Sequence, residues 1–125
     1  EKGALLKNGY NQIAIETGMD IYTRCIGYNC RSMVTFTPEA GNGLEVKALM
    51  QQEMIKRGVL WAGFHNLCFS HTDEDIDYTL SAYRDVMPIM KEAITSGNVK
   101  QYLKGEVLEA VCRKVNNYNI KPKTA

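Results

Sequence analysis

The sequence predicts an α+β domain in which a small, mostly antiparallel sheet of two hairpins is covered by helices. Three observations carry this prediction. Apolar residues recur at helical spacing in three separate stretches, and segments rich in β-branched and aromatic residues lie between these stretches. The chain has 125 residues, which is enough for a single hydrophobic core. We therefore treat residues 1–125 as one domain.

The first helix is predicted to run from near the start of the chain to a glycine cap at Gly18. Residues 21–37, which follow it, are rich in Tyr, Thr, Ile, Val and Phe. They are interrupted by Gly-Tyr-Asn at 27–29 and end at Pro38, a pattern typical of a two-stranded hairpin. Arg24 and Arg31 flank this hairpin and could clamp an anion, but a solvated strand face is the favoured interpretation.

A second amphipathic helix is predicted over residues 46–57, ended by Gly58 after two cations that suit the negative end of the helix dipole. The Gly-Asn-Gly turn at 41–43 before it could hold an anion, although a plain turn between elements is favoured. Residues 59–70 contain Gly63 and the pair His65–Asn66, and they predict two short strands around a turn.

A third helix is predicted to begin at Thr72, because Thr72 and Asp75 form a capping-box pattern. Its apolar stripe continues to residue 96, with a kink expected at Pro88. The acidic residues of its first turns are interpreted as helix capping rather than as a cation site; they are Asp73, Glu74, Asp75 and Asp77. Beyond Gly97, the pattern predicts a short helix at 99–103 and an irregular or strand-like piece at 107–115.

Composition excludes several classes of protein. The chain is 45% hydrophobic and 23% charged, which argues against a disordered tail, a fibre or a membrane protein. A net charge of +1 offers no field for nucleic acid or anionic lipid, so neither nucleic acid nor a membrane is expected as a partner. The four dispersed cysteines are predicted to be buried free thiols, which fits a cytoplasmic protein. Glu1 starts what looks like a helix in progress, so we expect a fragment of a longer protein.

One array of possible metal ligands stands out, His65, Cys68 and His71. Three-residue steps on a strand alternate between faces, and no fourth ligand is evident, so no metal site is predicted. Cys68 with either histidine could form a nucleophile and base pair. No oxyanion donor or orienting group accompanies it in the sequence, and the structural interpretation of all three residues is favoured.

Two segments resemble the C-terminal part of class III pyridoxal-phosphate-dependent aminotransferases, and most closely the glutamate-1-semialdehyde 2,1-aminomutases. They are Gln-Glu-Met-Ile-Lys-Arg-Gly-Val-Leu at 52–60 and Phe-Ser-His-Thr-Asp-Glu-Asp-Ile-Asp at 69–77, followed by Thr79 and Leu80. In that family a helix ends in Arg-Gly-Val, a hairpin follows, and a helix opens with His-Thr-x-Glu-Asp-Ile. The resemblance covers residues 5 to 95.

The resemblance implies the small domain of a fold-type I enzyme, which caps an active site built on a large domain. The large domain would hold pyridoxal phosphate and its covalent lysine, and the intact enzyme would be a homodimer. This chain alone would bind no cofactor and be inactive. Many relatives place an arginine or a glutamate in the stretch that is Trp-Ala-Gly-Phe-His-Asn here, at 61–66, so a carboxylate clamp is absent and the amino substrate stays open.

By position, the turn carrying Trp61, His65 and Asn66 is predicted to contact substrate in the intact enzyme. An indole offers an apolar wall, while an imidazole and an amide offer hydrogen bonds. The competing interpretation buries Trp61 in the core and leaves His65 in solvent. A second hypothesis for the whole chain is an autonomous, non-catalytic protein-interaction module.

Overall fold

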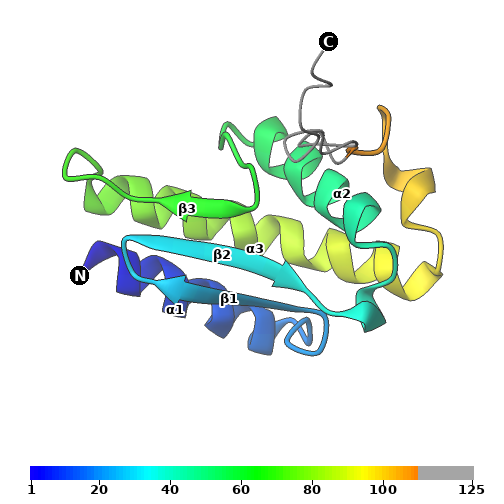
Figure 1. Cartoon of the computed structure of the whole chain (residues 1–125), viewed down its shortest axis with the longest axis horizontal. Helices are drawn as coiled ribbons and strands as arrows, with labels where there is room; N and C mark the ends of the chain where they lie inside the picture. Colours follow the sequence, from blue (N-terminus) through cyan, green and yellow to red (C-terminus); the bar gives the residue numbers. More distant parts are fainter. Residues whose placement is uncertain (110–125) are drawn as a thin grey trace, which may run out of the picture.

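The computed structural model describes residues 1–109 and shows an α+β fold (Figure 1). Three main helices and one three-stranded antiparallel sheet form it, together with two short 3-10 helices. In chain order the elements are α1 (Lys2–Glu16), β1 (Thr23–Tyr28), β2 (Arg31–Phe36), η1 (Pro38–Ala40), α2 (Gly43–Lys56), β3 (Phe64–Asn66), α3 (Asp73–Ser96) and η2 (Val99–Tyr102).

The sheet has the strand order β1-β2-β3. The first hairpin is confirmed, with Cys25 opposite Val34 in its register. The second predicted hairpin is wrong, because residues 59–70 contribute the single strand β3, which pairs with β2. The start of this segment serves instead to end α2, since the Val59 N–H donates to the Met54 carbonyl at 3.0 Å. The chain joins the sheet from Gly63 onward, where the Gly63 carbonyl accepts the Val34 N–H at 2.9 Å.

Helices cover one face of this sheet (Figure 1). Side chains on that face alternate along each strand and are buried; they are Thr23, Cys25, Ser32, Val34 and His65. Helix α3 packs against both α1 and α2, and it continues through Pro88 to the left-handed Gly97, so Pro88 is no stop. Within residues 1–109, none of the helices combines the length and apolar character needed to cross a membrane.

The predicted start of α3 is confirmed in detail. The Thr72 hydroxyl accepts the Asp75 N–H at 3.2 Å, and the Asp75 carboxylate accepts the Thr72 N–H at 2.7 Å. These hydrogen bonds hold the pKa of Asp75 below its usual range. The capping interpretation of the acidic run is thus confirmed for Asp75, and Asn42 caps α2 in the same way through its side-chain oxygen.

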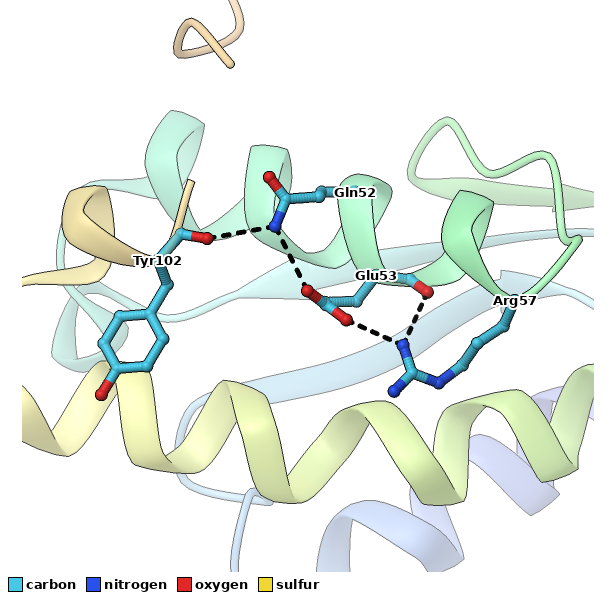
Figure 2. A network of polar contacts seen from close by, with 4 residues as sticks. All are labelled: Gln52, Glu53, Arg57 and Tyr102. Carbon is cyan, nitrogen blue, oxygen red and sulfur yellow. Dashed lines mark hydrogen bonds and ion pairs between the residues drawn. The ribbon is translucent and has the colours of Figure 1, made fainter. Parts of the chain in front are cut away.

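A polar network ties the end of the described chain to α2 (Figure 2). The Gln52 amide donates to the Tyr102 carbonyl at 3.1 Å and to the Glu53 carboxylate at 3.2 Å. Arg57 completes the network with an ion pair to Glu53 at 2.8 Å. Burial raises the pKa of Glu53, but the hydrogen bonds from Arg57 and Gln52 outweigh burial and lower it. The predicted helix at 99–103 is therefore a short 3-10 helix that is tied to α2 by Gln52. Of the last predicted piece, residues 110–115 lie outside the described residues.

We expect Thr72→Ala to lower the free energy of unfolding by about 1 kcal/mol, because it removes the hydroxyl that caps α3. Chemical denaturation measures this as a lower midpoint with an unchanged slope. Thr95→Ala is the matched control, since Thr95 is an exposed threonine in the last turns of the same helix. A midpoint that moves equally in both variants would contradict the assignment of Thr72 as the cap.

Candidate functional site

The three residues predicted to contact substrate line one small cavity. Its volume is about 160 Å³, and it lies between β3 and the first half of α3. Trp61, His65 and Asn66 contribute to one side, and Asp75 and Thr79 contribute from α3. The prediction of a turn at His65–Asn66 is wrong, because both residues belong to strand β3 and point to opposite faces of the sheet.

Trp61 and His65 are buried, with 2% and 6% of their surface exposed. Their polar atoms turn inward onto the hydroxyl of Tyr83 on α3, which lies 2.7 Å from the Trp61 indole nitrogen and 2.6 Å from His65 Nε2. The other ring nitrogen of His65, Nδ1, lies 2.9 Å from the Ser32 hydroxyl on β2. We call Ser32, Trp61, His65 and Tyr83 the buried polar network.

The positions of the protons follow from the chemistry of these groups. An indole N–H can only donate, so Tyr83 accepts from Trp61 and has its own hydroxyl proton left for His65 Nε2. His65 Nδ1 then carries the ring proton and donates it to Ser32. Burial favours this neutral ring and lowers the pKa of His65 to about 4. Burial also raises the pKa of Tyr83 well above its usual value.

Trp61 and His65 line the cavity, but the polar atoms of the buried polar network are bonded to one another and turned inward. Ser32 is 1% exposed, so the serine and histidine pair presents no nucleophile at the surface. Tyr10 packs edge-on against Tyr83 with ring centroids 4.8 Å apart and extends the cluster to Thr23. Neither Ser32 nor Tyr83 was predicted as a partner of His65. In the sequence, Tyr83 is only one residue of the apolar stripe of the third helix. No local sequence pattern indicates that Ser32 contacts His65.

Asn66 is the one predicted residue whose side chain is available to a ligand. It is exposed, and its side-chain amide makes no hydrogen bond within residues 1–109. The other polar groups at the cavity are engaged elsewhere, since Asp75 closes the capping box and the Thr79 hydroxyl donates to the Asp75 carbonyl at 2.8 Å. The cavity therefore offers a ligand apolar surface, and the Asn66 amide is exposed on the outer side of the strand that borders it.

The outer face of the sheet is the second candidate surface. Ile26, Met33 and Phe64 lie side by side across the three strands and are 46%, 55% and 40% exposed. The Arg31 guanidinium lies over the Phe64 ring, 5.6 Å from its centroid. Arg24 lies opposite Thr35, so the two arginines form no clamp, and the interpretation as an exposed strand face is confirmed.

The remaining candidates separate in space. Among residues 1–109 no three metal-ligating side chains come together, and His65 lies in the buried polar network. Cys68 instead lies 3.3 Å from His71. The prediction of buried thiols is wrong for Cys30 and Cys68, which are exposed in the loops at the ends of the strands, and right for Cys25. Cys112 lies outside the described residues.

We expect the unfolding free energy to fall by up to about 3 kcal/mol between pH 6.5 and pH 4 because of His65. In this range the unfolded chain binds a proton that folded His65 does not, so stability is lost as the pH falls. His65→Gln should flatten this slope, measured by denaturation at several pH values. His71→Gln removes the only other histidine and should keep the steep fall. An unchanged slope in His65→Gln would contradict the buried neutral ring.

The cavity and the outer sheet face have the chemistry of binding surfaces. They supply apolar area, one free amide and an arginine stacked on an aromatic ring. Neither presents an exposed nucleophile or a free acid and base pair among its described residues. No protein-family model matches the chain, and no solved structure matches it either.

Proposed function

We propose that this chain is the C-terminal small domain of a pyridoxal-phosphate-dependent enzyme similar to the class III aminotransferases, and most closely to the glutamate-1-semialdehyde aminomutases. In this role it caps the active site and contributes to substrate binding, while a preceding large domain holds the cofactor. The intact enzyme is a homodimer in this proposal. The 125 residues alone are inactive.

The observation that carries the proposal is the uncovered outer face of the sheet. A sheet is stable when its apolar faces are buried against another layer, and here only one face has that layer. The row of Ile26, Met33 and Phe64 leaves three apolar side chains in solvent in the centre of the other face. A large domain packed against this face would bury that row.

The order of the elements also supports the proposal. Helix α2 ends at Arg57 and the left-handed Gly58, strand β3 follows, and α3 opens after His71 and Thr72. This is the order in which the resembling enzymes place their Arg-Gly-Val helix end, their strands and their His-Thr-x-Glu-Asp-Ile helix start. The second hairpin of that pattern is reduced here to one strand.

The lysines in the first part of the chain are poor candidates for a covalent cofactor link. The Lys2 ammonium donates to the His71 carbonyl at 2.8 Å, and the Lys7 ammonium donates to the Gly27 carbonyl at 3.0 Å. Both contacts stabilise turns of the fold. Pyridoxal phosphate, held elsewhere in the enzyme, would supply the electron sink for the reaction. This chain would supply apolar surface at the edge of the active site, with the exposed Asn66 side-chain amide available for a hydrogen bond to substrate.

The same uncovered face also fits the second candidate, an autonomous protein-interaction module. The two differ in what precedes Glu1. The enzyme requires an upstream domain with a lysine that borohydride traps to pyridoxal phosphate in the full-length protein. A full-length protein without such a lysine would contradict the enzyme and leave the interaction module.

In the full-length protein, we expect Met33→Glu to lower thermal stability and cofactor content, because it places a carboxylate in the centre of the proposed domain interface. In the 125-residue chain the same change should alter the unfolding free energy by no more than about 0.5 kcal/mol, since Met33 is exposed there. Ile15→Glu is the control, because Ile15 is 59% exposed on α1. If Met33→Glu behaves like Ile15→Glu in the full-length protein, the face is not the interface.

We expect Asn66→Ala to reduce kcat/KM of the full-length enzyme about tenfold or more with cofactor content unchanged, the pattern of a lost substrate contact. His65→Ala cannot serve as the probe, because it breaks the buried polar network. Asn8→Ala, at an exposed asparagine of α1, is the matched control. Full retention of kcat/KM in Asn66→Ala would remove Asn66 from the substrate site.

A further inference from the structure

The loop between β3 and α3 brings an exposed thiol and an imidazole together. Cys68 Sγ lies 3.3 Å from His71 Nδ1. The Cys68 N–H donates to the same nitrogen at 3.0 Å, so Nδ1 is a ring nitrogen that accepts and carries no proton. The thiol therefore faces a proton acceptor at hydrogen-bond distance.

Two contacts hold the backbone at His71 and the residue after it. The Lys2 ammonium donates to the His71 carbonyl at 2.8 Å, and the capping box of α3 begins at the next residue. The Asp75 carboxylate lies near His71, and His71 contributes after the Thr72 hydrogen bonds to the lowered pKa of Asp75. The loop thus places a base beside a cysteine nucleophile.

A cavity of about 750 Å³ opens beside Cys68. Tyr28, Asn29 and Cys30 line it from the β1–β2 turn, and Phe69 lines it from the same loop as Cys68. The start of α1 lines it as well, and Gly3 approaches the turn so closely that an added Cβ would lie 1.7 Å from the Asn29 carbonyl oxygen. The cavity is large enough for a small organic group attached to the Cys68 sulfur.

We propose that Cys68, with His71 as its base, is a site of thiol–disulfide exchange with low-molecular-weight disulfides. The Cys68 sulfur gives its proton to His71 and attacks one sulfur of the disulfide. A bond forms between the two sulfurs, the original disulfide bond breaks, and the leaving thiolate takes the proton from His71. The products are one mixed disulfide on Cys68 and one free small thiol. The proposal is independent of the proposed enzyme function.

The chain contains its own controls for this reaction. Cys30 is also exposed and lines the same cavity, but within residues 1–109 no imidazole lies within hydrogen-bond distance of its sulfur. Cys25 is buried, with 2% of its surface exposed. If exposure alone set reactivity, Cys30 and Cys68 would react alike. The His71 contact predicts that they differ.

The experiment treats the 125-residue chain carrying Cys112→Ser with glutathione disulfide at neutral pH and follows each cysteine by peptide mass spectrometry. We expect Cys68 to be modified about tenfold faster than Cys30, with Cys25 protected. His71→Gln should reduce the Cys68 rate to that of Cys30, while Cys30→Ser should leave it unchanged. Denaturation curves check that both variants stay folded.

Two results would overturn the proposal. Equal rates at Cys30 and Cys68 would show that exposure alone determines modification. An unchanged Cys68 rate in a folded His71→Gln variant would show that the imidazole does not act as the base. If His71→Gln does not fold, a folded His71→Ala variant is used instead, and its Cys68 rate is measured with and without added imidazole. Failure of imidazole to restore the rate would count against the proposal.

Discussion

Buried polar groups must find partners inside the protein, and in this fold one tyrosine hydroxyl is the partner of two of them. Tyr83 accepts from Trp61 and donates to His65, which in turn reaches Ser32 on the next strand. The contacts require β3 to pair with β2 so that His65 lies opposite Ser32. A slip of one residue would send the imidazole to solvent and bring Phe64 or Asn66 inside. The buried polar network therefore specifies the register of a strand only three residues long.

Local signals allowed much of this fold to be predicted. The ends of α2 and α3 followed from Gly58, Thr72 and Asp75, whose preferences act over a few residues. The second hairpin was predicted wrongly because Val59 and the Trp61 carbonyl bond to α2 instead of to a strand, an interaction between segments that strand propensity does not report. The cavity lined by Trp61, His65 and Asn66 was found by position, whereas the partners of His65 depend on tertiary packing.

Strand β3 links the interior to both surfaces with which function is associated here. His65 points to the helices, while Phe64 and Asn66 point away from them. His65 anchors the strand through its hydrogen bonds to Ser32 and Tyr83. Phe64 and Asn66 give the outer surface an aromatic side chain and a side-chain amide. The loop that follows carries Cys68 and His71 before the cap of α3. Strand β3 thus positions residues toward the core, on the outer face of the sheet and in the loop that leads to α3.

The one-sided sheet has a consequence for how this protein tolerates sequence change. In the isolated domain, substitutions along β1 and β2 should be tolerated at every second position, because inward residues such as Cys25 and Val34 are buried and outward ones such as Ile26 and Met33 are not. Wherever a second body covers the outer face, that two-residue periodicity disappears. The contrast between the two patterns of tolerance would trace the footprint of the covering surface, residue by residue, without any structure of the assembly.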